Sequence, residues 1–208
     1  AHAMGNSAGN LKDFWDQWRT LPRIIGGCIW EFKDQGLEKT DSAGVKYYAY
    51  GGDFGEKYFD NFTIKGIVNA DGKPKGVMEE CKRIFQPIQC EWADKKIRII
   101  NRSNVFNVNK YNCILIIKED GWNVLKKAIT NLDIKPGEEE LFDLAPYLPV
   151  LKPNSDYHIN FRFTFKDSTA WADKHHIISE NQFEIKQTAI KKSAIKGEGF
   201  IVRHGLDG

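Results

Sequence analysis

The 208-residue sequence has no long hydrophobic run, no large net charge and no dense set of cysteines. Apolar residues never approach ~18 in succession, which excludes a membrane-spanning helix. Thirty basic residues against 28 acidic ones leave a formal net charge of +2, so no broad electrostatic field indicates nucleic acid or a membrane as a partner. The four cysteines show neither CxxC spacing nor a disulfide framework and are typical of buried thiols.

The sequence also lacks internal repeats, a phosphate-binding loop, a dinucleotide-binding fingerprint and the motifs of a Ser/His/Asp catalytic triad. Its first ten residues contain neither the basic nor the apolar region of a signal peptide, and the sequence does not indicate a cellular compartment. About a quarter of the residues are Phe, Ile, Leu or Val, which is enough for a packed core. The length fits one large domain or two small ones, and it is too short for a complete (β/α)8 barrel with a further domain.

The first part of the chain has the pattern of an α/β unit. Residues 11–21 carry apolar side chains at helical spacing, with Asn10 as a candidate N-cap and Pro22 as the stop. Residues 24–32 form a glycine-bearing apolar run, which is typical of a strand buried on both faces. After a long loop, residues 74–87 predict a second helix. This order of helix, buried strand and helix is typical of a parallel sheet with covering helices.

From Ile88 onwards the pattern changes to short strands separated by turns. Along residues 157–166 apolar and polar side chains alternate, which predicts a strand with one buried face and one wet face. Asp120-Gly121 and Pro136-Gly137 are typical of turns between strands. Such a series of short antiparallel strands indicates a β-sandwich. The expected strands are residues 96–101, 113–119, 122–130, 139–144, 157–166 and 182–186.

Carboxylates and one tryptophan are the candidates for chemistry. Paired carboxylates can hydrolyse a glycoside or an ester, but charged loop residues are also commonly solvated turn residues. His175 and His176 are adjacent rather than one helical turn apart, and they predict no metal site. Trp30, near the end of the expected buried strand, either stacks on the C–H face of a sugar or fills the core. The candidate carboxylates are Glu31, Asp34, Asp53 and Asp60.

Four motifs of the first part carry a resemblance to a known family. In order and spacing they resemble the closing section of the catalytic barrel in glycoside hydrolase family 2, and in particular in its large β-galactosidases. In the second part, residues 132–137 and 169–172 resemble more weakly the immunoglobulin-like domain that follows that barrel. The four motifs are AHAMGNS at residues 1–7, GGCIWEFKDQ at 26–35, YGGDFG at 50–55 and GIVNAD at 66–71.

The resemblance implies a mainly β fold, an immunoglobulin-like β-sandwich preceded by an incomplete α/β remnant of a TIM barrel. Residues 1–87 would be the remnant, with residues 24–32 as its eighth strand. Residues 88–186 would be the sandwich, and residues 187–208 a linker into a following domain. A lone barrel strand exposes two faces and two edges, so we expect it to be buried either by the sandwich or by a second copy of the chain in a homo-oligomer or swapped dimer.

The resemblance also implies that the parent protein is a retaining hydrolase of terminal β-D-galactosides. In the family the glutamate nucleophile lies two residues before the Ala-His pair, here Ala1-His2, and the acid/base glutamate lies far upstream. Both carboxylates are therefore expected outside this chain, which alone would be inactive. A β-glucuronidase or β-mannosidase of the same family is the runner-up. A standalone carbohydrate-binding or interaction sandwich is the alternative from another class.

The resemblance assigns sugar-binding roles to individual residues. His2 matches a histidine that hydrogen-bonds galactose hydroxyls, and Trp30 matches the tryptophan platform under the sugar. Phe62 matches a phenylalanine near the 6-hydroxyl, whose backbone carbonyl helps to hold a sodium ion. The resemblance implies no cofactor in this chain, and magnesium and sodium ions in the parent.

Lys65 departs from the pattern, because the family has an asparagine as a sodium ligand there. A fixed ammonium disfavours a neighbouring cation, so the sodium site is not expected to survive. Lys65 instead resembles the lysine with which β-glucuronidases hold a carboxylate, although Thr63 replaces an asparagine of that motif. This lysine predicts that the parent accepts a modified or anionic galactoside.

Overall fold

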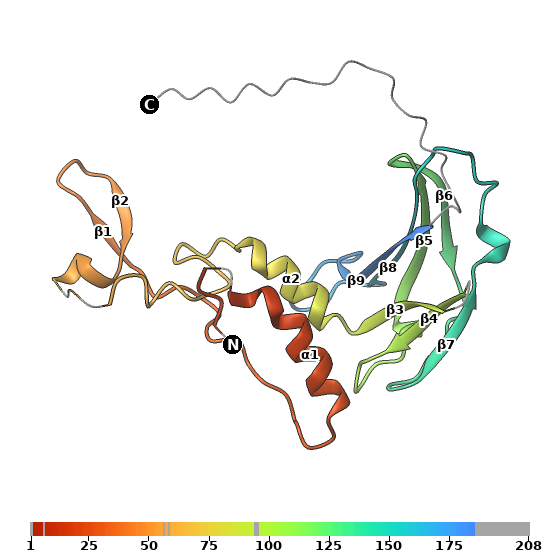
Figure 1. Cartoon of the computed structure of the whole chain (residues 1–208), viewed down its shortest axis with the longest axis horizontal. Coiled ribbons are helices and arrows are strands. Elements are labelled where there is room, and N and C mark those ends of the chain that lie inside the picture. Colours follow the sequence, from red (N-terminus) through yellow and green to blue (C-terminus); the bar gives the residue numbers. More distant parts are fainter. Residues whose placement is uncertain (1, 6, 56, 58, 94–95, 186–208) are drawn as a thin grey trace, which may run out of the picture.

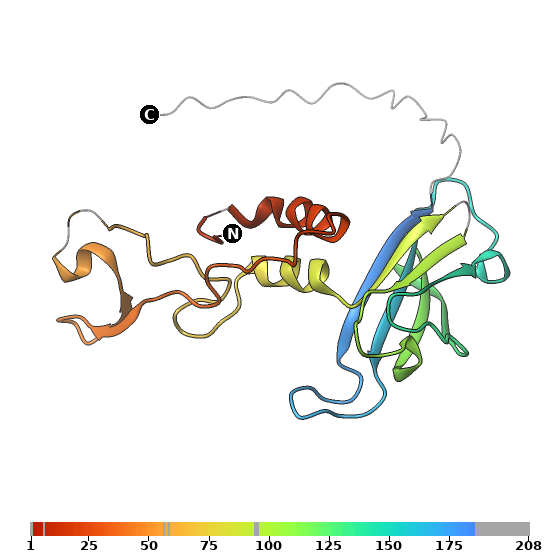
Figure 2. The same ribbon diagram turned by 90° about the horizontal axis from the view of Figure 1, so that it is seen from below.

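The computed structural model describes residues 2–5, 7–55, 57, 59–93 and 96–185. The chain is elongated, with a β-sandwich at one end, two helices in the middle and a small hairpin at the other end (Figures 1 and 2). The linker expected at residues 187–208 lies outside the described residues. Within the described ranges, no helix is long and apolar enough to cross a membrane.

The mainly β fold predicted from the sequence is confirmed. The part before the sandwich contains η1 (Ser7–Asn10), α1 (Leu11–Thr20), β1 (Leu37–Thr40), β2 (Lys46–Ala49), η2 (Gly51–Phe54) and α2 (Gly76–Phe85). The sandwich contains β3 (Ile88–Ala93), β4 (Lys96–Asn101), η3 (Val108–Lys110), β5 (Tyr111–Glu119), β6 (Trp122–Ile129), β7 (Glu139–Asp143), η4 (Ala145–Tyr147), β8 (Tyr157–Phe165) and β9 (Ile177–Ile185).

Helices α1 and α2 lie side by side and share a small core (Figures 1 and 2). The rings of Trp15 on α1 and Phe85 on α2 meet edge to face, with their centroids 4.7 Å apart. Asn10 occupies the N-cap position of α1 as predicted, but its side chain makes no capping hydrogen bond. Its backbone is not extended, because η1 runs directly into the helix. The buried residues of this core are Ala3, Ala8, Leu11, Ile67, Val68, Cys81 and Ile84.

The buried strand predicted at residues 24–32 does not form. Among the described residues, its strand-like pairing is limited to an isolated parallel bridge between Trp30 and His2. Ile25 is fully exposed, and Trp30 and Phe32 are more than half exposed. A strand of a parallel sheet gains its hydrogen bonds from strands on both sides, and the described residues supply isolated bridges there instead of ladders. The segment is therefore apolar like a core strand but stays at the surface.

Two extended segments, residues 31–35 and 63–68, lie side by side through backbone hydrogen bonds. Gly66 is required at their closest approach, because a Cβ there would lie 2.4 Å from the backbone nitrogen of Asp34. The buried Asp34 carboxylate accepts hydrogen bonds from the Gly66 N–H at 2.8 Å and from the Lys75 ammonium at 2.7 Å. Asp34 thus ties both segments to the start of α2.

The sandwich is built from two antiparallel sheets, with strand orders β3-β4-β7 and β6-β5-β8-β9. The expected strands from residue 96 onwards all exist, although β9 begins at Ile177, several residues before the predicted strand. The strand β3 and the hairpin β1–β2 were not predicted. The hairpin strands are almost fully exposed and have no apolar face, so periodicity gives no signal for them.

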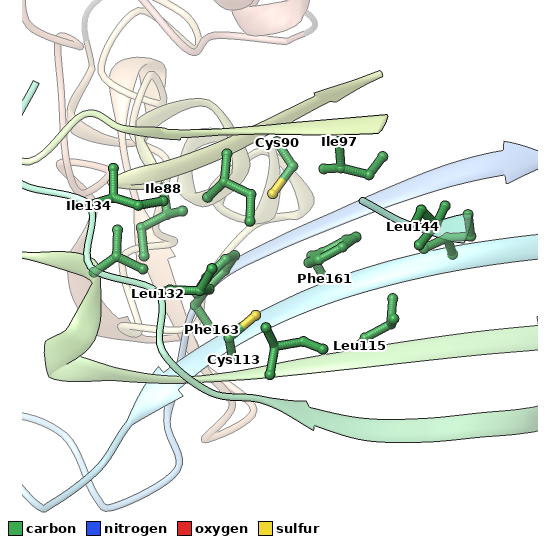
Figure 3. Packing of buried hydrophobic residues seen from close by; sticks show 14 of the residues in the cluster. Ile88, Cys90, Ile97, Cys113, Leu115, Leu132, Ile134, Leu144, Phe161 and Phe163 are labelled. Carbon is green, nitrogen blue, oxygen red and sulfur yellow. The ribbon is translucent and has the colours of Figure 1, made fainter. Parts of the chain in front are cut away.

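The sandwich core lies between the two sheets (Figure 3). On β8, Tyr157, Phe161 and Phe163 point into it and are almost completely buried. The opposite face of β8 is less wet than predicted, since Asn160 and Thr164 are each only 4% exposed. The cause is the central place of β8 between β5 and β9, whose side chains cover it on both sides.

The side chain of Asn181 on β9 joins the two sheets to the end of α2. Its Oδ1 accepts hydrogen bonds from the Cys90 N–H at 3.1 Å and from Nε2 of Gln86 at 2.9 Å. Its Nδ2 donates to the Ile88 carbonyl at 3.4 Å. Strands β3 and β9 are edges of different sheets, so this buried amide satisfies backbone groups that no ladder serves.

The cysteines are thiols, and three of the four are buried as predicted. Burial raises the pKa of Cys113 to about 12 and raises the pKa of Cys90 well above its ordinary value. Burial also raises the pKa of Cys81. Cys28 is exposed, which contradicts the prediction, because it lies in the segment that does not form a buried strand.

Replacing Asn181 should destabilise the sandwich strongly. Asn181→Ala leaves the buried backbone N–H of Cys90 without its acceptor and removes one of the two acceptors of the Gln86 side-chain amide, and we expect the free energy of unfolding to fall by about 2–4 kcal/mol. Glu184→Ala, on the exposed face of the same strand, is the matched control and should change it by less than about 0.5 kcal/mol. Urea unfolding followed by circular dichroism measures both, and equal losses would contradict the role given to Asn181.

Thiol labelling should distinguish Cys28 from the other three cysteines. Alkylation requires the thiolate, which an exposed thiol forms far more readily near pH 8 than a buried thiol of raised pKa. Iodoacetamide should therefore modify Cys28 in the folded chain, and Cys81, Cys90 and Cys113 only after unfolding. Peptide mass spectrometry at successive times measures this order. Early modification of Cys113 would show that the sandwich core is open.

Candidate functional site

The four expected sugar-binding residues come from three segments that meet at one backbone carbonyl. The Lys65 carbonyl accepts hydrogen bonds from the N–H groups of Ala3 and Glu31, each at 3.2 Å. These bonds place His2 and Trp30, which also form a parallel bridge, beside the segment that contains Phe62 and Lys65. The fold therefore brings together residues that lie far apart in the sequence.

Trp30 presents its ring to the surface. The residue is 56% exposed, which excludes the alternative that it fills the core. The peptide bond between Trp30 and Glu31 is cis. Phe62 is also 56% exposed, so the site has two accessible aromatic rings on neighbouring segments. Accessible aromatic faces of this kind can pack against the C–H face of a sugar.

Lys65 is a buried cation within this site. The residue is only 7% exposed, and its Nζ lies 3.5 Å from Oε1 of Glu31. The same Nζ lies 4.4 Å from the centroid of the Phe62 ring, in the range of a cation–π contact. The ammonium is therefore held between a carboxylate and an aromatic face. Such partners are needed because an isolated charge is costly to bury.

Glu31 is the functional candidate whose partner sequence reasoning missed. Its Oε2 accepts a hydrogen bond from Nε2 of Gln35 at 2.8 Å. Its Oε1 is buried and, in the part of the chain that the structure describes, accepts no hydrogen bond; the buried Thr63 hydroxyl also makes none. Lys65 therefore supplies the charge that compensates this carboxylate oxygen. No sequence signal pairs these residues, since a long loop separates them.

The remaining candidate carboxylates have structural roles. Asp53 accepts a hydrogen bond from the Tyr50 N–H at 2.9 Å and closes the turn of η2. Asp60 is a turn residue with a positive φ of 28°. Both fit the interpretation as turn residues. Asp34 does not, because it is buried and engaged with Gly66 and Lys75. These contacts leave Glu31 as the carboxylate of the candidate site.

The residues at Lys65 do not fit a sodium ion. Two positive charges about 4 Å apart repel each other by about 4 kcal/mol at an effective dielectric constant of 20, and the Lys65 ammonium is fixed beside the Phe62 ring. Among the described residues, no group of three or more His, Cys, Asp or Glu side chains could hold a metal ion. His176 instead packs on the ring of Phe165, with centroids 6.3 Å apart.

A cavity of about 370 Å³ lies elsewhere, between α1 and the sandwich. Burial, followed by the charge of Arg102, lowers the pKa of Arg19 at its edge. Gln86 and Asn181 also line the cavity and already hydrogen-bond to each other. We assign this space to the junction between the two parts of the chain and the candidate site to the exposed rings of Trp30 and Phe62.

Comparison with known proteins agrees with this two-part structure. Residues 1–90 match the sequence model described as "Glycosyl hydrolases family 2, TIM barrel domain". Residues 97–186 match the one described as "Beta-galactosidase, domain 4".

Curated relatives named β-galactosidase match most of the chain. The protein from Vibrio cholerae is 35% identical over 184 residues, which are 88% of this chain and 18% of the relative. The protein from Priestia megaterium is 31% identical, over 93% of this chain and 19% of the relative. The protein from Halalkalibacterium halodurans is 31% identical, over 98% of this chain and 20% of the relative. The chain spans about a fifth of the length of these relatives and belongs to glycoside hydrolase family 2, with matches to part of the family's TIM-barrel domain and to the domain described as domain 4.

Proposed function

We propose that this chain forms the sugar-binding wall of a parent enzyme that hydrolyses terminal β-D-galactosides with retention of configuration. The observation that carries the proposal is the convergence of His2, the exposed ring of Trp30, and Phe62 around Lys65. The names of the curated relatives support the same substrate class.

Each residue has a distinct role in the proposal. The indole of Trp30 stacks on the apolar C–H face of galactose, because its ring is exposed and its backbone is held by neighbouring segments. The imidazole of His2 hydrogen-bonds sugar hydroxyls. The Phe62 ring packs beside the 6-hydroxymethyl group. The site thus combines apolar surfaces with a few polar groups, as small-molecule sites commonly do.

The proposal assigns both catalytic carboxylates to the part of the parent that this chain does not span. Retaining hydrolysis requires two carboxyl groups ~5–5.5 Å apart, one as the nucleophile and one as the acid and then the base. The nearest candidates are committed elsewhere, since Glu31 pairs with Lys65 and Asp34 with Lys75. The chain alone is therefore expected to be inactive.

The exposed apolar side chains of residues 24–32 need a cover in the parent. We propose that further barrel strands provide it, since a strand of this composition is normally buried on both faces. A second copy of the chain in a homo-oligomer or swapped dimer is the other proposed cover.

One observation favours a second candidate, a parent that accepts an anionic sugar such as a glucuronide. Lys65 brings a positive charge to the site, and binding of an anionic galactoside, as predicted from the sequence, would require such a charge. The ion pair with Glu31 opposes this candidate, because that carboxylate already neutralises the ammonium. A neutral β-galactoside is therefore the preferred substrate in our proposal.

The full-length protein tests the function on a panel of nitrophenyl glycosides. We expect the highest kcat/KM on the β-galactoside, and Trp30→Ala should lower it about 100-fold, which corresponds to about 2.7 kcal/mol of lost transition-state stabilisation. Trp171→Ala is the matched control, because Trp171 is also exposed but lies on the sandwich, and it should leave kcat/KM unchanged. A higher kcat/KM on the glucuronide, or equal losses in both variants, would contradict the proposal.

The 208-residue chain by itself is the second arm of the experiment. It should hydrolyse no glycoside above the buffer rate. Hydrolysis that Glu31→Gln abolishes would instead place a catalytic carboxylate within this chain.

A further inference from the structure

Lys65 contacts all three segments of the sugar site. Its carbonyl binds the N–H groups of Ala3 and Glu31, and its ammonium lies against the Glu31 carboxylate and the Phe62 ring. The residue is almost completely buried, so its charge serves the interior of the site. Its ammonium contacts the Phe62 ring and the Glu31 carboxylate, so Lys65 acts as a positioning residue.

We propose that the Lys65 ammonium is the resident cation of this site and takes the place of a bound monovalent metal ion. The inference rests on the proposed galactosidase function of the parent. It follows that hydrolysis by the parent requires neither Na⁺ nor K⁺. The fixed ammonium holds Glu31 and Phe62 in position, and it arrives with the chain rather than from solution.

The local chemistry suits an ammonium better than a metal ion. A hard cation needs several oxygen ligands, whereas the Lys65 carbonyl already accepts two backbone hydrogen bonds. One face of the ammonium meets an aromatic ring, which attracts an organic cation but offers no oxygen. The other contact, Oε1 of Glu31, supplies one negative charge, which a single ammonium neutralises.

Removing the ammonium should create a cation site. Lys65→Asn leaves the buried Oε1 of Glu31 without its counter-charge and adds an amide oxygen beside it. A small monovalent cation from solution can then occupy the space that the lysine side chain leaves. Lys65→Met also removes the charge but adds no oxygen, so an added cation should restore much less of the lost activity in this variant.

The experiment measures kcat and KM of the full-length protein on a nitrophenyl β-galactoside in NaCl, KCl and choline chloride at one ionic strength. The wild type should give the same kcat/KM in all three salts, within about twofold. Lys65→Asn should lose at least about tenfold in choline, and added Na⁺ or K⁺ should restore it in a saturable manner. Lys73→Asn, at an exposed lysine outside the site, is the matched control and should behave as the wild type.

The outcomes separate this inference from the proposed function. A wild type that loses activity in choline overturns the inference without any variant, so the test holds even where Lys65→Asn fails to fold. A Lys65→Asn protein that is equally active in all three salts also overturns it. A wild type that hydrolyses no β-galactoside in any salt contradicts the proposed function instead.

Discussion

The ion pair between Lys65 and Glu31 is the interaction on which the candidate site depends. Each partner compensates the charge of the other, because removing one partner of a buried ion pair typically costs about 3–5 kcal/mol. The pair also sets the backbone, since the Lys65 carbonyl binds the N–H of Glu31 and of Ala3. Trp30 and His2 therefore hold their places through a residue that need not touch the sugar.

A continuous set of contacts connects this pair to the sandwich. Gly66, next to Lys65, donates its N–H to Asp34, and Asp34 binds Lys75 just before α2. The end of α2 continues into Gln86, whose side chain bonds to Asn181 of β9. The sandwich thus supports the segments of the candidate site through α2, although it contributes no residue to that site.

Periodicity predicted the parts of the fold whose own side chains determine their structure. Helix α1 and the strands from β4 onwards carry regular apolar patterns, and Asp120-Gly121 forms the β5–β6 turn with positive φ at both residues. The prediction of a strand at residues 24–32 was wrong for the opposite reason. This segment can form a strand only beside neighbouring strands, which the described residues do not supply. The prediction that Cys28 is buried failed for the same reason, because Cys28 lies in this segment.

The candidate site was also predictable only in part. The motifs identified His2, Trp30 and Phe62 by resemblance, and the fold brings their segments together, while their roles in sugar binding stay a prediction. The contacts of Glu31 with Lys65 and of Asp34 with Lys75 could not be predicted, because each joins residues separated by a long loop and is set by tertiary packing. Asp34 looked like a loop carboxylate because sequence alone does not reveal burial.

The most direct measurement is a crystal structure of the full-length protein grown in rubidium chloride, with anomalous data that locate every bound rubidium ion. Our account predicts that no rubidium peak lies beside Glu31 and Phe62, and that density for the Lys65 ammonium fills that position. A rubidium ion bound there, with the Lys65 side chain turned away, would contradict it.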